Sequence, residues 1–327
     1  MNKRTPIFLD KKTQELFELN GYVVLDLLNA EEAQQLSEAY KSEDFGNPEG
    51  FYSTSFSKDE ALKTKLTSLI EAKVEAKAQK ILAPFTSLGS CYLAKAPGEK
   101  STMPWHQDWT VVDESQYDSM TIWVALQDVN EQNGAMKIVA GSHRFSDKLR
   151  SPLLGNPLSE IENALEKDAQ YINLKKGQAI VFSQALMHAS PPNLSNEKRL
   201  AVTYGFIPKE ANLFFYYKND AGLLEKYQVP NTFFKNYNTQ IGQKPSEGKL
   251  LETLSIQETK ITLEEYKLMK ARFTMKKNKM THMKPLFKNP EHQSFFENEG
   301  YLVLPLLSEE EVEDLKNYYH SLGLVDE

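Results

Sequence analysis

The chain has 327 residues, of which 40% are hydrophobic and 25% are charged, a balance typical of a globular protein. Its formal net charge of -7 at pH 7 argues against a nucleic-acid partner, because such proteins draw much of their affinity from basic residues. No stretch approaches the roughly 20 apolar residues that cross a bilayer, and the N-terminus lacks the pattern of a secretion signal. We therefore expect a cytoplasmic protein with no membrane contact. Cys91 is the only cysteine, which excludes an intrachain disulfide and leaves the chemistry to histidine, carboxylate and arginine side chains.

The first quarter of the chain predicts helices around one short strand. Apolar residues recur at helical spacing over 11–19, 31–40 and 58–82, and "GYVVL" at 21–25 has the pattern of a strand. From about residue 88 the apolar period changes to two. Further strands are expected in "SCYLAKA", "SMTIWVALQDV", "MKIVAG", "QAIVFS" and "RLAVTYGFI", which are separated by turn-forming clusters. Helices return with the Lys-rich stretch "ITLEEYKLMKARFTMKKNKM" at 261–280.

The stretch "SMTIWVALQDV" at 119–129 predicts a strand with two different faces. One face is apolar and suited to a core: Met120, Ile122, Val124 and Leu126. The other is semi-polar and suited to lining a cavity: Thr121, Trp123, Ala125 and Gln127. Many short strands with few helices between them predict a mainly β fold with flanking helices, arranged as an antiparallel sandwich or barrel.

The chain also contains an internal repeat. Residues 6–40 align without gaps on residues 285–319, with an offset of 279 residues, which is a domain length rather than a solenoid period. Either the chain ends just inside a second copy of the domain, or a duplicated helix–strand–helix docks elsewhere on the first copy. We expect the first alternative, with a main domain over 1–275, a basic linker over 276–284 and the repeat over 285–327.

The motif "HQD" within "MPWHQDWT" is the first sign of chemistry. Residues two apart on a strand point to the same side, so His106 and Asp108 can both reach one metal ion while Gln107 points away. Two histidines and one carboxylate on one face of an octahedron leave three sites open, as in non-haem Fe(II) oxygenases. The expected third ligand is His188, which follows a predicted buried strand, whereas the other four histidines fall in a turn, the basic linker or the repeat. A simpler alternative is that His106 and His188 are ordinary core or rim histidines.

Arg199 is the second sign. It is one of only five arginines, and it opens the strand "RLAVTYGF" eleven residues after His188. The alternation puts it on the face of the small residues Ala201, Thr203 and Gly205, where its planar guanidinium can bind a carboxylate through two hydrogen bonds. A surface arginine at the start of a strand is the commoner situation, but it leaves the small-residue face unexplained.

Four stretches together resemble the phytanoyl-CoA dioxygenase family of Fe(II)/2-oxoglutarate oxygenases: "ELFELNGYVVLDLL", "HQD", "IWVALQDVNEQNGAMKIVAGSHR" and "MHASPPNLSNEKR". The resemblance covers residues 6 to about 215. It implies a double-stranded β-helix, a jelly-roll barrel buttressed by helices. It also implies that His106, Asp108 and His188 bind iron and are the catalytic centre.

The same resemblance implies a co-substrate site. Arg199 would bind the far carboxylate of 2-oxoglutarate, and Gln107, Trp123 and Lys95 match further positions of the co-substrate pocket. The expected activity is hydroxylation of an unactivated C–H bond of a small organic substrate, using O2 and releasing succinate and CO2. Related halogenases have a small residue in place of the carboxylate ligand, so Asp108 favours hydroxylation.

Two rival functions stay open. A jelly-roll barrel can be a non-enzymatic small-molecule-binding module, or a metal-dependent oxygenase or isomerase that does not use 2-oxoglutarate. Arg199 distinguishes these from the first interpretation, since neither needs a grip on 2-oxoglutarate.

An aromatic-rich stretch at 212–237 follows the last predicted strand of the barrel. Its members are Phe214, Phe215, Tyr216, Tyr217, Tyr227, Phe233, Phe234 and Tyr237. They form either a lid over the substrate or the core beneath flanking helices. The substrate and the oligomeric state are not predicted by the sequence.

Overall fold

The fold is that of a computed structural model, which describes residues 4–46, 48–237, 242–256, 260–282, 287–299 and 302–322. The chain divides into two compact units, residues 1–273 and residues 274–327. Among the described helices, none is both long and apolar enough to span a membrane.

Three helices begin the first unit, each at a polar N-cap. α1 (Lys11–Asn20), α2 (Ala30–Lys41) and α3 (Glu60–Ala78) start after Asp10, Asn29 and Asp59, whose side chains accept a backbone N–H of the first turn. All three helices were predicted, although the predicted span 58–82 is longer than α3 at both ends. The predicted strand between the first two helices is β1 (Tyr22–Asp26).

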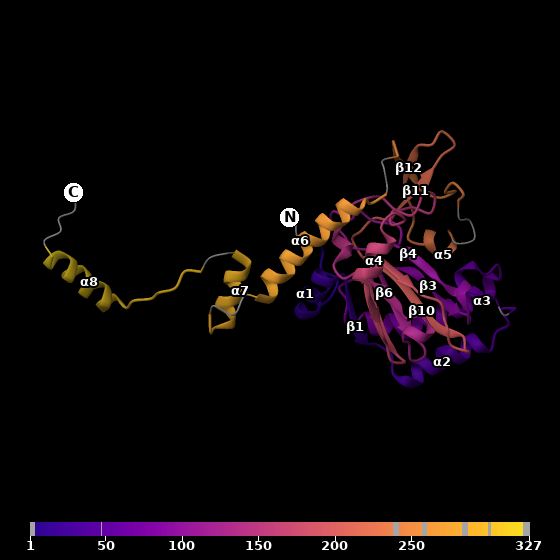
Figure 1. Cartoon of the computed structure of the whole chain (residues 1–327), viewed down its shortest axis with the longest axis horizontal. Coiled ribbons are helices and arrows are strands. Elements are labelled where there is room, and N and C mark those ends of the chain that lie inside the picture. The colour runs from indigo at the N-terminus through magenta and orange to yellow at the C-terminus, as the bar shows by residue number, and fades with distance from the viewer. Residues whose placement is uncertain are drawn as a thin grey trace. The chain divides into compact units, whose positions relative to one another are not determined.

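A six-stranded antiparallel sheet carries β1 at one edge. Its order is β1, β8 (Gln178–Ser183), β5 (Met120–Ala125), β10 (Arg199–Pro208), β3 (Phe85–Lys95) and β2 (Phe51–Ser53). One face of this sheet packs on α1, α2 and α3 through a large apolar cluster that includes Phe17, Leu36, Leu66 and the predicted core face of β5 (Figure 1). The expected alternation along 119–129 is therefore confirmed.

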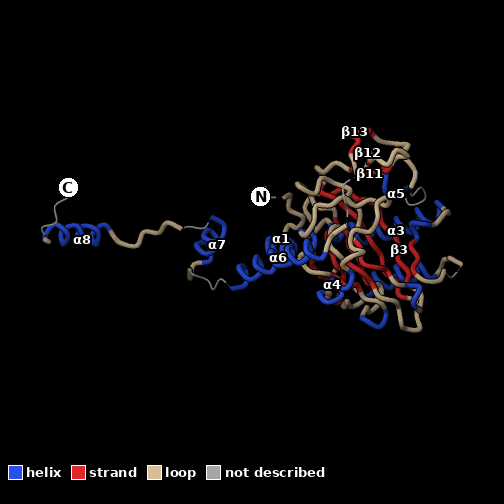
Figure 2. The backbone as a smooth tube through the Cα atoms, turned by 45° about the horizontal axis from the view of Figure 1, so that its top comes forward, coloured by secondary structure: helices blue, strands red, loops and turns tan. Residues whose placement is uncertain are grey.

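A second, four-stranded antiparallel sheet lies across the other face. Its order is β4 (Met103–His106), β9 (His188–Ser190), β6 (Met136–Ile138) and β7 (Gln170–Ile172). Trp123 and Ile180 of the first sheet share an apolar cluster with Ile138 and Ile172 of the second. The mainly β, double-stranded β-helix architecture is thus confirmed, as an open pair of sheets, because no ladder among the described strands joins them into a closed barrel. Figure 2 shows most strands of this unit gathered in its middle, with α3 and α4 outside them and β11, β12 and β13 at the top.

Short elements complete the first unit. They are η1 (Thr54–Phe56), η2 (Glu99–Ser101), η3 (Glu131–Asn133), η4 (Ser142–Arg144), α4 (Glu162–Asp168), β11 (Phe214–Lys218), β12 (Leu224–Gln228), α5 (Phe233–Tyr237) and β13 (Lys249–Leu254). β11, β12 and β13 form a separate three-stranded antiparallel sheet.

The aromatic-rich stretch at 212–237 forms β11 and β12 of this small sheet and the helix α5. Phe215 and Tyr227 are buried in a cluster with Val111 and Val112, and Phe233 and Phe234 pack against it. None of the described aromatic residues of the stretch lines the cavity between the two large sheets. The stretch therefore serves as a core in this structure, and the side chain of Tyr237 lies outside the described residues.

Three helices follow: α6 (Leu263–His282), α7 (Pro290–Glu299) and α8 (Glu309–Ser321). α6 runs from the first unit into the second, and its described turns include residues 276–282 of the predicted linker. The three predicted regions remain a proposal.

Candidate metal centre

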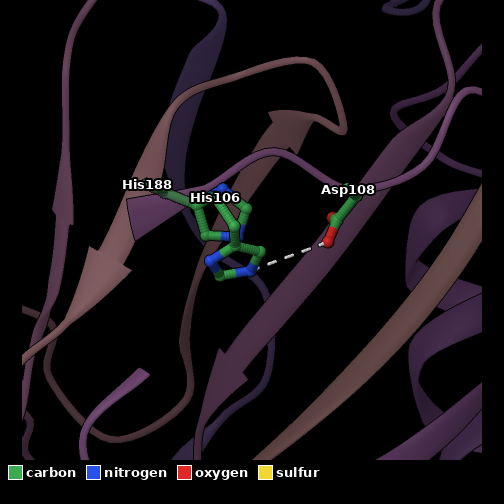
Figure 3. Close-up of side chains that lie close together, drawn as sticks. All are labelled: His106, Asp108 and His188. Carbon is green, nitrogen blue, oxygen red and sulfur yellow. Dashed lines mark ion pairs between the residues drawn. The ribbon is translucent and has the colours of Figure 1, made fainter. Parts of the chain in front are cut away.

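His106, Asp108 and His188 come together between the two sheets. His106 ends β4 and His188 begins β9, and these two residues face each other in the antiparallel register of the second sheet. One ligand atom from each of the three side chains lies within 4.8 Å of the others. This is the one cluster of three or more potential metal ligands among the described residues. Figure 3 shows the two imidazole rings close together, with the Asp108 carboxylate directed at them; the ring planes are tilted by 48°.

Asp108 reaches the cluster by a different route from the one expected. Strand β4 ends at His106, so the two ligands do not lie on one continuous strand. The backbone of Asp108 is held instead by two hydrogen bonds: its N–H donates to the Gln184 carbonyl at 2.8 Å, and its carbonyl accepts from Arg150 Nε at 2.7 Å. Its Oδ1 then lies 4.0 Å from His106 Nε2.

Backbone carbonyls hold both imidazole rings in place. Nδ1 of His106 lies 2.8 Å from the Pro104 carbonyl, and Nδ1 of His188 lies 2.8 Å from the Leu186 carbonyl. A carbonyl oxygen only accepts, so each Nδ1 carries the proton and each Nε2 keeps a free lone pair. Burial and the neighbouring His106 lower the pKa of His188 to about 4, so its imidazole is neutral at pH 7, as metal binding requires.

A cavity of about 220 Å³ opens beside these ligands. Its walls come mainly from the inner faces of the two sheets: Phe51, Leu93, Met103, Thr121, Trp123, Met136, Phe182, Ala189, Ser190, Arg199 and Thr203, together with the three ligands. Thr121 and Trp123 of the semi-polar face of "SMTIWVALQDV" thus line a cavity, as predicted, whereas Ala125 and Gln127 of that face do not. Sequence reasoning did not single out the hydroxyls of Thr121 and Ser190, although the alternation of β5 already placed Thr121 on this face.

Arg199 is a buried cation that faces this cavity. Its side chain is 3% exposed, and its guanidinium carbon lies 4.9 Å above the Trp123 ring. No carboxylate among the described residues lies within ion-pair distance, and Nε has no hydrogen-bond partner among them. Burial lowers the pKa of Arg199 to about 10, which leaves it charged at pH 7. A buried, unpaired guanidinium is costly, so this position calls for an anion.

Lys95 and Gln107 have other partners. Lys95 stands opposite Arg199 in the β3–β10 register, but its Nζ donates to the carbonyls of Ser190, at 3.0 Å, and of Pro191. Burial, with Arg199 nearby, lowers the pKa of Lys95 to about 7. Gln107 Nε2 donates to the Ala185 carbonyl at 2.5 Å. Neither side chain lines the cavity, so both hold its walls in place, whereas Trp123 and Arg199 face it directly.

Arg150 is a residue that sequence reasoning missed. It is 3% exposed, binds the backbone of Asp108, and pairs with Glu114 through both terminal nitrogens. The pair ties down the segment that follows the "HQD" motif. Its only sequence signal is the scarcity of arginine, because the two residues are 36 positions apart.

Curated relatives match part of the chain. The phytanoyl-CoA dioxygenase domain-containing protein 1 homolog of Dictyostelium discoideum is 30% identical over 125 residues, which cover 35% of this chain and 43% of that protein. A probable alpha-ketoglutarate-dependent hypophosphite dioxygenase of Stutzerimonas stutzeri is 35% identical over 122 residues, covering 35% of this chain and 43% of that protein. The chain spans about half the length of the curated relatives it matches.

Solved structures show a partial likeness. EvdO2 from Micromonospora carbonacea var. aurantiaca, complexed with 2-oxoglutarate, has 17% identity and a TM-score of 0.48, covering 63% of this chain and 94% of that chain. HygX from Streptomyces hygroscopicus, with nickel, 2-oxoglutarate and hygromycin B bound, has 15% identity and a TM-score of 0.47, covering 65% and 94%.

The sequence profile of the family described as phytanoyl-CoA dioxygenase (PhyH) matches residues 17–201, which is more than half of the chain. The matched range contains His106, Asp108, His188 and Arg199. This protein therefore belongs to the phytanoyl-CoA dioxygenase family.

Proposed function

We propose that this protein is an Fe(II)- and 2-oxoglutarate-dependent dioxygenase that hydroxylates an unactivated C–H bond of a small organic substrate, using O2 and releasing succinate and CO2. One observation carries the proposal: two histidines and a carboxylate converge on a cavity that also holds a buried, unpaired arginine. Family membership supports the dioxygenase class.

The donor set fits iron. Neutral imidazole nitrogens and a carboxylate oxygen suit Fe(II), and a set of three leaves coordination positions open for a co-substrate and dioxygen. Nδ1 of each histidine donates to a backbone carbonyl, that of Pro104 or of Leu186, which leaves Nε2 of each ring available to a metal. His106, Asp108 and His188 are therefore the proposed iron ligands.

Arg199 fits the far carboxylate of 2-oxoglutarate. Its guanidinium lies beside the metal ligands in one cavity, and a dicarboxylate bound there would supply the missing anion. The Trp123 ring holds the guanidinium from one side, and Thr203 supplies a hydroxyl on the same wall. Lys95 is proposed to support this wall through its bonds to the Ser190 and Pro191 carbonyls.

The chain's own residues would orient the reactants and exclude water. Arg199 sets the direction of the co-substrate from the buried end, and Leu93, Met136 and Phe182 keep the walls apolar. His106 and Asp108 are about one-third exposed, so a substrate would approach from their side. When bound, the iron and 2-oxoglutarate would supply the oxidising chemistry. The carboxylate of Asp108 occupies the position that a halide would need, which favours hydroxylation over halogenation.

The test is an anaerobic titration with Fe(II) followed by 2-oxoglutarate, watching for the weak visible absorption band of a keto acid chelated to iron. A saturable band in the wild type that is absent in His188→Ala supports the proposal. If no band forms, or if iron binding is indifferent to His188, the protein is a binding module or uses different chemistry.

A further inference from the structure

We call residues 6–41 the N-terminal segment and residues 285–320 the C-terminal segment. Residues 8–20 and 30–41 of the first fold like residues 287–299 and 309–320 of the second. With the offset of 279 residues, α7 begins and ends at the residues that correspond to the ends of α1. α8 begins at the residue that corresponds to the first residue of α2. The side-chain oxygen of Gln14 accepts from Phe8 N at 2.9 Å, and that of Gln293 accepts from Phe287 N at 3.1 Å. Both α2 and α8 begin with a capping box. The repeat therefore reproduces local structure, and not only sequence.

The two segments differ in what covers them. Matched leucines are buried in the N-terminal segment and exposed in the other: Leu27 7% against Leu306 85%, Leu28 6% against Leu307 46%, and Leu36 0% against Leu315 56%. β1 pairs with β8, whereas residues 302–305, its counterpart, form no strand. Figure 2 draws the stretch before α8 as loop. A strand needs a neighbour for its N–H and C=O groups, so the C-terminal segment has the pattern but not the partner.

The N-terminal segment shows which surface fits this pattern. β1 pairs with residues 178–182 of β8, and α2 packs against α3 within the large apolar cluster. Leu36 and Leu66 are fully buried there. The matching apolar face of the C-terminal segment is therefore complementary to a surface made by β8 and α3.

Charge favours the C-terminal segment on that same surface. Lys77 pairs with Glu32 of α2 at 2.9 Å, while Lys73 and Lys176 donate to the neutral side chains of Gln35 and Gln34, each at 2.5 Å. The matched residues of α8 are all acidic: Glu311, Asp314 and Glu313. On that surface α8 would meet the three lysines with three carboxylates instead of one, and two extra surface ion pairs favour binding by about ten-fold at low salt.

We propose that the C-terminal segment docks on a second copy of this chain, in the place held there by residues 6–41. Residues 302–305 pair with β8 of that copy, α8 packs on its α3, and the N-terminal segment of that copy is released. Such an exchange of equivalent elements is a low-cost route to a dimer. Two residues of α8 are larger than the residues they would replace: Val312 stands for Ala33 and Lys316 for Ser37. Their extra volume opposes the binding energy gained from the additional ion pairs. The exchange should therefore be reversible. The proposal rests on the repeat alone and is independent of the enzymatic function.

A charge exchange in the full-length chain tests this. One variant carries Lys73→Glu and Lys176→Glu, and the other carries Glu313→Lys and Asp314→Lys. The residues that Lys73 and Lys176 contact, Gln35 and Gln34, are neutral, so the first variant breaks no ion pair of its own fold, although it places a carboxylate near Glu32. The second variant removes only the exposed Glu313–Lys316 pair of α8. Measured by sedimentation equilibrium, the wild type should dimerise with concentration and dissociate with added salt. Each variant alone should be monomeric, and their equimolar mixture should dimerise again.

A matched control changes the same charge elsewhere on α8. Glu309→Lys with Glu310→Lys should leave the dimer intact, because the counterparts Ala30 and Glu31 contact no lysine among the described residues. Hydrogen exchange gives the second readout: in the dimer, protection should fall over 11–41 and rise over 302–321.

Three results would overturn the proposal. The first is a wild type that stays monomeric at every concentration reached. The second is a dimer that survives in both charge variants, which would indicate that α8 associates with itself. The third is a dimer in which residues 11–41 stay protected, since no exchange has then occurred.

Discussion

Arg199 illustrates how one buried residue can point to a binding site. Its side chain is almost fully buried over Trp123, and no carboxylate among the described residues pairs with it. Folding a guanidinium into such a place costs free energy that a bound anion restores. Lys95, its neighbour across the ladder, donates to two backbone carbonyls and therefore needs no bound anion. Two buried cations in register therefore have different roles.

Replacing Arg199 should chiefly weaken the binding of 2-oxoglutarate. Arg199→Met removes a charge-assisted contact and should raise the dissociation constant of 2-oxoglutarate about 100-fold, or ~3 kcal/mol. Arg199→Lys should recover only part of this loss, because an ammonium cannot bind a carboxylate in the same planar manner. The anaerobic absorption titration measures both, with Lys100→Met, an exposed cation, as the control. Unchanged 2-oxoglutarate affinity in Arg199→Met would remove this assignment.

Adjacent residues of the "HQD" motif should behave in opposite ways. Asp108→Ala removes a proposed ligand and should lower Fe(II) affinity by at least about 100-fold, with little effect on the melting temperature of the metal-free protein. Gln107→Leu should keep Fe(II) affinity but lower stability by about 1–3 kcal/mol, because the Ala185 carbonyl loses its donor. Isothermal titration and thermal unfolding separate the two effects. Similar metal affinities in the two variants would contradict the ligand assignment.

At the scale of elements, the site depends on what happens where β4 ends. The alternation of a strand would have put His106 and Asp108 on one side, yet the strand stops at His106 and Asp108 is placed by Gln184 and Arg150. The buried Arg150–Glu114 pair, 36 residues apart, fixes the segment between the motif and the following turn. A ligand on an irregular segment keeps its position only as long as these contacts hold.

Breaking the Arg150–Glu114 pair should therefore make the position of Asp108 less well defined and so weaken metal binding. Arg150→Met should weaken Fe(II) binding roughly ten-fold, the lower end of what outer contacts of metal ligands contribute. Glu114→Gln, which keeps the Arg150 bond to Asp108, should have a smaller effect. Lys148→Met is the control, since its ammonium binds the Lys260 carbonyl and Glu265 instead. An Fe(II) affinity that is equal in Arg150→Met and the wild type would show that Arg150 has no positioning role.

At the scale of the whole molecule, His143 joins elements that are distant in sequence. Its ring packs on Phe17 of α1 at a centroid distance of 5.8 Å and against Gly21, where an added Cβ would lie 2.4 Å from Nδ1. Gly21 also has a positive φ of 80°, which favours glycine at the end of α1. Neither ring nitrogen of His143 has a hydrogen-bond partner among the described residues. Burial lowers its pKa to about 3.

This burial predicts how stability depends on pH. An unfolded histidine has a pKa near 6.5, so between about pH 6.5 and 3 the unfolded chain binds a proton that folded His143 does not. Stability should fall as the pH falls through this window, by at most about 1.4 kcal/mol per pH unit for His143. In the metal-free protein His188, with a pKa near 4, adds a similar slope over the upper part of the window. Chemical unfolding at a series of pH values should give a clearly flatter profile for His143→Leu, and an unchanged slope would contradict the prediction.

The sequence by itself determined the features that depend on local spacing. The helices predicted over 11–19 and 31–40, the two faces of β5 and the inward face of Arg199 follow from apolar periodicity, because it acts over a few residues. The motif and the spacing from His106 to His188 and Arg199 were enough to indicate the family. The assignment of roles to these residues remains a proposal.

Only the tertiary structure decided the rest. The sheet order that brings His188 opposite His106, the pairing of Arg150 with Glu114, and the satisfied state of Lys95 depend on contacts between residues dozens of positions apart. The same reason separates the two copies of the repeat. Related sequences form α1 and α7 with matching bounds, but among the described residues only the copy that meets β8 has a strand. Local sequence determines a helix, whereas a strand and a buried site need a partner that local sequence does not contain.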